Sequence, residues 1–212
     1  MKPPLLVSLA ALAALSGAAA QSKSSSPSNV ERLRYVVAPT GNEARYRVRE
    51  QLVGFDLPND AVGATKAITG RVVVESDGKV VKDSSKILID LSTLKSDKGR
   101  RDGYLRRASL ETSKYPKAEM VPTALQGVVV PLAPGTSKTF AVVGDLTIRG
   151  VTHPTTWQVT ARAEGKDIVG TAATAFTFKD FSLEQPRASV VLSVADTIKL
   201  EYDFRFVPDT AR

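Results

Sequence analysis

The densest group of chemically capable side chains is the stretch "GRRDGYLRRASLETSKYP" at residues 99–116, which holds four arginines and a tyrosine before residue 108. Guanidinium groups bind phosphates and carboxylates. Nucleic-acid recognition, however, requires a basic face with stacking aromatics or a helix that fits a groove. Asp102 and Glu111 lie among these arginines, and Leu105 and Leu110 are suited to anchor the stretch. We predict a short helix or crossover near residues 100–113 with locally paired charges, and no nucleic-acid partner.

Residues for catalysis or metal binding are scarce. The chain has one histidine, His153, and no cysteine, which excludes a thiol nucleophile and the usual Cys/His zinc sites. Nucleophile elbows, zinc-protease motifs, phosphate-binding glycine loops and EF-hand loops are absent from the sequence. The acidic residues mostly occupy outward strand positions or loops, not positions that predict a carboxylate pair. We expect a protein that is not an enzyme and has no cofactor and no metal.

The first twenty residues follow the order of a secretory signal peptide. A short basic start precedes an apolar run from Leu5 to Leu15, and small residues end the segment at Ala20. The run is shorter than the roughly 20 apolar residues of a membrane span. We predict a signal peptide at 1–20, cleaved after Ala20, then a disordered Ser-rich tether at 21–29 and one domain at 30–208. The expected location is periplasmic or secreted.

Alternation with period two dominates the rest of the chain. In "IKLEYDFRF" (198–206), apolar side chains alternate with charged ones, as in a strand with one buried and one solvated face. Comparable patterns predict strands at 33–38, 45–49, 72–74, 87–91, 120–130, 139–149, 156–163, 169–178 and 188–195. Because almost no helix is available to cover them, these strands must pack on one another in a sandwich or a closed antiparallel barrel.

The inward positions of these strands form a large apolar set. An eight-stranded barrel has an interior that either fills with side chains or holds one small ligand. From the residues alone, both a packed core and an apolar lumen remain open. The candidate ligand-binding residues are Tyr46, Val48, Ile87, Ile89, Phe140, Val142, Trp157, Phe176, Phe178, Leu200, Tyr202 and Phe204.

Three stretches carry a resemblance to a known family. They are "GDLTIRGVTHPTTW" (144–157), "RRDGYLRRASLETSKYP" (100–116) and "QPRASVVLSVADTIKLEYDF" (185–204), with weaker support from "VGATKAITG" (62–70). In this order and spacing the chain resembles the YceI family over roughly Tyr35 to Val207. The resemblance implies an all-β fold, an elongated eight-stranded antiparallel lipocalin-like barrel. It also implies a closing pair of strands with Asp196 in the turn between them.

The same resemblance implies a ligand, a polyisoprenoid or fatty-acid derivative held in the lumen. Arg101 and Arg106 are then candidate contacts for its headgroup. The chain departs from the family where many relatives carry a histidine in the second strand, because Glu50 and Gln51 stand near that place. Two phenylalanines usual after the arginine segment are also absent. The loop at 54–63 is either a lid at one mouth or a loop pinned by its own apolar residues.

Three functions follow as alternatives. The leading prediction is non-enzymatic binding and carrying of a long-chain apolar or amphiphilic molecule, with peripheral membrane contact as a further option. The second is an envelope stress or interaction protein whose basic surface binds anionic polymers or headgroups, since the formal net charge is +7. The third is a lipid hydrolase or isomerase acting in the lumen. A homodimer also remains open.

Overall fold

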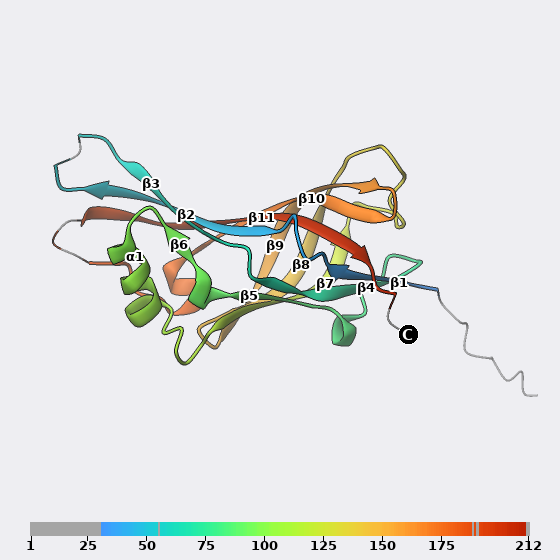
Figure 1. The fold of residues 1–212 in the computed structure, drawn as a ribbon, viewed down its shortest axis with the longest axis horizontal. Coiled ribbons are helices and arrows are strands. Elements are labelled where there is room, and N and C mark those ends of the chain that lie inside the picture. Colours follow the sequence, from blue (N-terminus) through green and yellow to red (C-terminus); the bar gives the residue numbers. More distant parts are fainter. Residues whose placement is uncertain (1–30, 55, 188, 190, 211–212) are drawn as a thin grey trace, which may run out of the picture.

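The computed structural model describes residues 31–54, 56–187, 189 and 191–210, and the predicted signal peptide, the tether and Phe55 lie outside these residues. Eight strands close into an antiparallel ring, in which the first strand pairs with the fourth and with the last (Figure 1). This ring confirms the predicted eight-stranded barrel. In ring order its strands are β1 (Arg32–Val37), β4 (Ile68–Glu75), β5 (Lys86–Asp90), β7 (Lys117–Gln126), β8 (Lys138–Ile148), β9 (Val151–Glu164), β10 (Asp167–Thr177) and β11 (Val191–Pro208).

Three further strands lengthen the barrel at one end. They are β2 (Glu43–Leu52), β3 (Asn59–Thr65) and β6 (Lys95–Ser96), and they continue the sheet from β11. One edge of β11 pairs with β10, while its other edge pairs first with β2 and then with β1. Strand β11 therefore belongs to both the ring and its extension. The molecule is longer than it is wide (Figure 1).

The corner between β1 and β2 is held by one buried side chain. Asn42 Nδ2 donates to the carbonyl of Ala38 (2.8 Å), and Asn42 Oδ1 accepts from the Tyr202 hydroxyl (2.9 Å) and from the backbone N–H of Arg205 (3.1 Å). A buried amide with its donors and acceptor engaged stabilises a unique bend. The corner lets the chain pair twice with the same edge of β11, first through β1 and then through β2.

Two predicted boundaries are wrong. Asp196 does not lie in a turn between two strands, because β11 runs unbroken from Val191 to Pro208. Between the pairs Val194–Glu50 and Ile198–Val48, three residues of β11 face one residue of β2, which is a bulge. In this bulge Asp196 is exposed although it has the parity of Val194 and Ile198, so the apolar alternation is interrupted as it would be at a strand end. In the predicted 54–63 loop, residues 59–63 belong to β3, and only the segment before them forms the turn.

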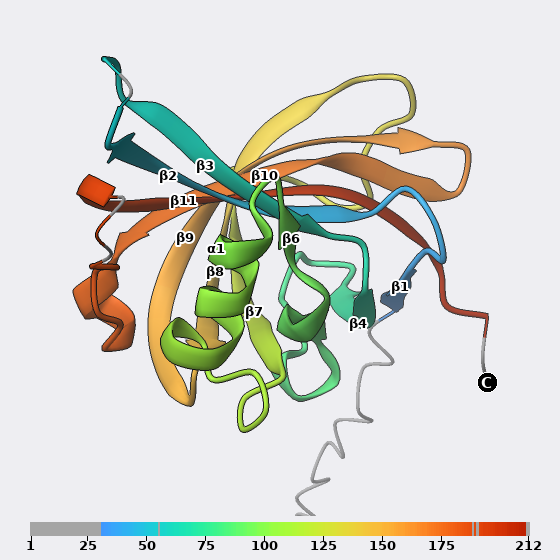
Figure 2. The ribbon, with the colours of Figure 1, turned by 60° about the vertical axis from the view of Figure 1, so that its left-hand side comes forward.

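The predicted short helix is present and lies at the extended end of the barrel. Helix α1 (Gly99–Tyr104) continues into a π-helical turn, η3 (Leu105–Ser109), beside β6 (Figure 2). Asp102 fixes it by accepting hydrogen bonds from the backbone N–H (2.9 Å) and the hydroxyl (2.7 Å) of Ser96. At the same end, the 3-10 turn η4 (Phe178–Phe181) follows β10. Two further 3-10 turns, η1 (Lys82–Ser84) and η2 (Leu91–Thr93), flank β5.

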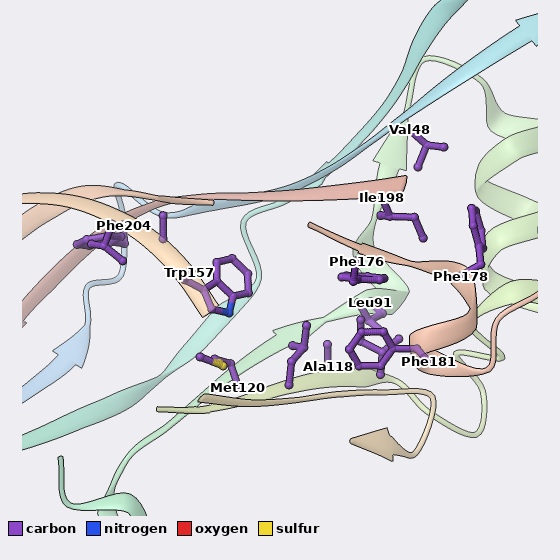
Figure 3. Packing of buried hydrophobic residues seen from close by; sticks show 14 of the residues in the cluster. Val48, Leu91, Ala118, Met120, Trp157, Phe176, Phe178, Phe181, Ile198 and Phe204 are labelled. Carbon is purple, nitrogen blue, oxygen red and sulfur yellow. The ribbon is translucent and has the colours of Figure 1, made fainter. Parts of the chain in front are cut away.

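Most of the buried hydrophobic residues form one cluster inside the barrel (Figure 3). Phe181 has no solvent exposure and meets Phe176 edge to face, with ring centroids 4.5 Å apart. The turn that carries Phe181 is held by a capping box between Thr177 and Asp180. Aromatic packing therefore closes the barrel wall between β10 and the start of β11.

Candidate lumen site

A cavity of about 790 Å³ runs through the barrel. Every strand of the ring contributes to its wall, together with β2, β3 and the helical segment. All twelve apolar residues that the alternation selected line this cavity, Trp157 and Phe204 among them (Figure 3). Its volume lies within the range of small-molecule sites, roughly 300–1,000 Å³. The interior is therefore lined by the predicted side chains but not filled by them.

Further lining residues escaped the sequence prediction. Leu146 and Ile148 on β8 have the parity of Phe140 and Val142, so the alternation predicts them on the same face, although they are not among the twelve predicted residues. Others come from turns and from the helical segment, where no period points inward, for example Leu94, Leu110 and Leu132. These side chains complete the wall where the strands end.

The two ends of the cavity differ in chemistry. Near the β1–β4 end the wall is mostly apolar, with Leu33, Val74, Leu125, Val128, Val130 and Leu132, and it also includes the side chain of Tyr35 on β1. At the α1 end the wall includes Tyr46, Glu50, Arg101 and Ser109, with Lys98 and Arg100 also lining it. The lumen is thus apolar over most of its length and polar at one end.

A buried ion pair forms part of the polar end. Arg101 Nη2 lies 2.5 Å from Glu50 Oε1, and the two side chains are 15% and 8% exposed. Arg101 Nη1 also binds Asp97 (2.5 Å), and Asn59 Nδ2 donates to Glu50 (3.3 Å). Burial alone would lower the pKa of Arg101, but its bonds with Asp97 and Glu50 raise it above its usual range. The expected local charge pairing is confirmed for Arg101.

Arg101 and Arg106 differ in position. Arg101 is in the cavity wall, whereas Arg106 is not, and Arg106 Nη1 donates to the carbonyl of Leu94 (3.3 Å). The structure therefore does not place Arg106 where a ligand in the lumen would meet it. Its role is to tie the π-helical turn to the segment after η2.

The side chain of Tyr46 lies on strand β3, next to the Glu50–Arg101 ion pair. Its ring covers Gly63 on β3, where an added Cβ would lie 2.3 Å from Tyr46 Cε1. Its hydroxyl is buried, and Ser96 lies within bonding reach of it, while the Ser96 hydroxyl itself donates to Asp102. Burial raises the pKa of Tyr46 to about 12, and the adjacent Arg101 only partly opposes this.

Other polar groups on aromatic wall residues are satisfied by the protein. Trp157 Nε1 donates to Thr155 Oγ1 (3.0 Å), which in turn donates to the carbonyl of Gly144 (3.1 Å). The Tyr202 hydroxyl binds Asn42, and burial raises the pKa of Tyr202. These groups are committed to the wall itself. Among the described residues of the cavity wall, Ser109 has a buried hydroxyl with no hydrogen-bond partner in the protein.

His153 does not line the cavity. Its Nδ1 lies 2.8 Å from the carbonyl of Pro154, and its Nε2 lies 4.0 Å from Asp180 on η4. In the part of the chain that the structure describes, no three His, Cys, Asp or Glu residues gather as metal ligands would. The described helices also include none with the length and hydrophobicity needed to span a bilayer.

The arginines on the outer face of β2 are paired with acids of the neighbouring strands. Arg45 Nη1 lies 2.7 Å from Asp203, Arg47 binds Glu201, and Arg49 lies 3.2 Å from Asp60. The Arg49 guanidinium holds the pKa of Asp60 below its usual value, with Arg47 adding to the effect. This basic stripe is therefore locally neutralised.

Comparison with known proteins agrees with this architecture. Residues 35–206 match the family model described as a YceI-like domain. A protein of Pseudomonas putida strain W619, named UPF0312 protein PputW619_0484, is 37% identical over 116 residues, which cover 50% of this chain and 57% of that protein. A UPF0312 protein of Shewanella denitrificans is 28% identical over 74% of this chain and 81% of its own length.

Two solved structures share the fold. One is a polyisoprenoid-binding domain from Saccharophagus degradans implicated in plant cell wall breakdown, with TM-score 0.66 and 18% identity, covering 84% of this chain and 99% of that one. The other is Burkholderia cenocepacia BcnA, with TM-score 0.59 and 17% identity over 80% and 98% of the two chains. At these identities the likeness is one of fold.

Proposed function

The chain belongs to the family of YceI-like domains, and on that premise we propose that it binds and carries a long-chain apolar or amphiphilic molecule in its lumen. The proposed ligand is a polyisoprenoid or a fatty-acid derivative, held without chemical change. The observation that carries the proposal is the cavity of about 790 Å³, walled by apolar side chains from every strand of a closed ring. The S. degradans domain, described as polyisoprenoid-binding, supports the same ligand class.

The energetics suit a chain-shaped ligand. Each methylene taken out of water contributes about 0.8 kcal/mol, so ten contribute roughly 8 kcal/mol before the cost of association is subtracted. The wall cannot collapse to fill the space, because each ring strand is hydrogen-bonded on both sides. Affinity then grows with chain length and needs few polar contacts.

We also propose that the protein is exported from the cytoplasm. With the signal peptide predicted at residues 1–20, the carrier would act in the periplasm or outside the cell, where a long apolar chain needs a protein to cross water.

Two exposed leucines at the α1 end, Leu57 (77% exposed) and Leu192 (64%), are the side chains we propose for peripheral contact with a membrane. Co-sedimentation with phosphatidylglycerol vesicles tests this contact, and Leu57→Ser with Leu192→Ser should weaken it. Unchanged sedimentation of the double variant would refute it.

The alternative functions have less support. A surface that binds anionic polymers needs cationic side chains that are not already paired, whereas the arginines on the outer face of β2 are paired with acids. A lipid hydrolase needs a base in the lumen, whereas His153 lies outside the wall and Glu50 is bound to Arg101. Incubating the loaded protein and analysing the extracted lipid tests the enzymatic alternative, which predicts an altered product.

Trp157 offers a direct test of binding, because it is the single tryptophan of the chain and lines the cavity. Retinol, an isoprenoid alcohol that absorbs where tryptophan emits, should quench Trp157 fluorescence saturably after the protein is stripped of lipid. Phe204→Asp should abolish the quenching, since it places a charge in the wall. Arg205→Ala should preserve it, since that side chain points outward to Asp167. Absence of quenching in the folded wild-type protein would refute the proposal.

A further inference from the structure

The connection between β7 and β8 lies at the end of the barrel opposite α1 (Figure 1). In its first half, residues 128–132, the side chains of Val128, Val130 and Leu132 line the cavity. Val129, between them, is 85% exposed. Val130 also faces the turn after β4, since its Cγ2 lies 4.0 Å from the position of a Cβ added to Gly78. The segment 128–132 therefore reaches across the β1–β4 end of the lumen, from β7 toward β4.

Few interactions hold this segment closed. Within the part of the chain that the structure describes, the backbone and side chains of residues 128–132 make no hydrogen bond. Their backbone polar groups must then be satisfied by water. Lifting the segment would break no hydrogen bond of its own and would expose mainly the three apolar side chains beneath it. Segments with so few contacts open at a low cost in free energy.

The two ends of the segment differ in freedom. Gly127, which joins it to β7, has a φ of +79°, and nothing lies within 4 Å of a Cβ added there. Glycine adopts positive and negative φ about equally readily, so the backbone can rotate at this position without a clash. Beyond the other end, an isolated bridge between Pro134 and Ala163 ties the chain to β9. The segment can therefore swing at Gly127 while it stays anchored at Pro134.

The helical segment at the opposite end of the lumen is held much more firmly. There Arg101 binds both Glu50 and Asp97, each at 2.5 Å. Asp102 accepts two hydrogen bonds from Ser96. Opening the barrel at this end would separate a buried ion pair, which is costly. The β1–β4 end is therefore the one that opens more readily.

We propose that residues 128–132 are a lid, and that long-chain molecules enter and leave the lumen at the β1–β4 end when this lid lifts. The inference rests on the proposed function and adds to it the route of exchange. Because the lid must open for entry and for exit, its opening sets both rates together. The lid lies at the end opposite Leu57 and Leu192, so ligand exchange and the membrane contact proposed above use different ends of the barrel.

A disulfide across the mouth of the barrel tests the lid. The chain has no cysteine, so Gly78→Cys with Val130→Cys introduces a single pair, and the two side chains are within reach of each other. Stopped-flow quenching of Trp157 measures how fast retinol binds and how fast it leaves for phosphatidylcholine vesicles. The oxidised and reduced forms of this one variant are compared, so strain from replacing the glycine is common to both. Oxidation should slow both rates at least about tenfold and leave the affinity unchanged.

A second disulfide is the matched control. Thr139 and Thr160 lie opposite each other on β8 and β9, outside the cavity wall, with their Oγ1 atoms 3.1 Å apart. Oxidation of Thr139→Cys with Thr160→Cys should change neither rate, because it joins strands that are already paired. Equal rates in the oxidised and reduced forms of the mouth variant would overturn the lid and leave the proposed function standing. If the wild-type protein shows no quenching, the proposed function fails and the lid with it.

Two neighbouring valines give a test that needs no disulfide. Val130→Asp places a charge beneath the lid and favours the open form, so retinol should both bind and leave at least about tenfold faster. Val129→Asp, on the exposed face of the same segment, should leave both rates as in the wild type. Loss of a wall contact alone would speed release but not binding. A Val130→Asp protein that binds retinol no faster than the wild type would therefore overturn the lid.

Discussion

At the scale of single residues, the lumen depends on contacts that join distant parts of the chain. Glu50 and Arg101 are 51 positions apart, yet their side chains form a buried pair at the polar end of the cavity. Removing one partner of a buried pair is costly because the other charge stays buried. No local pattern in the sequence links these two residues, and the arginine-rich stretch alone could not identify Arg101 as the member that lines the cavity.

The pair predicts a large effect of one substitution. Glu50→Ala should reduce the free energy of unfolding by about 3 kcal/mol, since Arg101 would keep Asp97 as its one acidic partner. Urea unfolding measures it. Arg49→Ala, which breaks an exposed pair with Asp60, is the matched comparison and should cost less than about 1 kcal/mol. Equal losses in the two variants would show that the Glu50–Arg101 pair is not buried as described.

A second residue-scale prediction concerns the close approach of Tyr46 and Gly63. In Gly63→Ala the new Cβ would overlap the Tyr46 ring, so the ring must move and the free energy of unfolding should fall by about 1–3 kcal/mol. Gly99→Ala is the control, because nothing lies within 4 Å of its added Cβ. Thermal unfolding of the two variants compares them. A Gly63→Ala protein as stable as the Gly99→Ala protein would contradict the packing of Tyr46 on β3.

At the scale of elements, alternation predicted the strands well where each strand has one wet and one apolar face. It predicted the inward residues of β5, β8 and β11, because a two-residue period specifies the face. It failed at the bulge of β11, where residues 195–197 interrupt the period although the strand continues. It also could not show that β3 begins at Asn59, because its residues, with Gly63 among them, carry a weak pattern.

The outer ion pairs of β2, β3 and β11 predict that the free energy of unfolding depends on pH. Burial tends to raise the pKa of Glu201, but bonds from Arg47 and Arg45 outweigh it and lower the pKa below the ordinary 4.5. The stabilisation from the pairs of Glu201 with Arg45 and Arg47 is therefore complete above about pH 4.5, and it is lost as pH falls through the lowered pKa. Urea midpoints should show Glu201→Gln less stable than wild type at neutral pH, with the gap closing on acidification. A gap that widens at low pH would contradict the assigned sign.

At the scale of the whole molecule, the sequence predicted the closed ring but not whether its interior was open. Alternation and the family resemblance define which side chains face inward, whereas an empty lumen depends on whether facing side chains meet across the barrel. That depends on strand tilt and on residues such as Leu94, Leu110 and Leu132, which lie outside any periodic pattern. The polar end of the cavity emerged only from the three-dimensional placement of charged side chains such as Glu50 and Arg101.

The central claim is that the barrel is a carrier with one long-chain molecule in its lumen. Native mass spectrometry of the protein purified from its native source, followed by solvent extraction, tests it most directly. The account predicts one bound long-chain species per barrel, released by organic solvent and absent from Phe204→Asp. A wild-type protein that shows only the mass of the bare chain, and that stays bare after incubation with retinol, would contradict it.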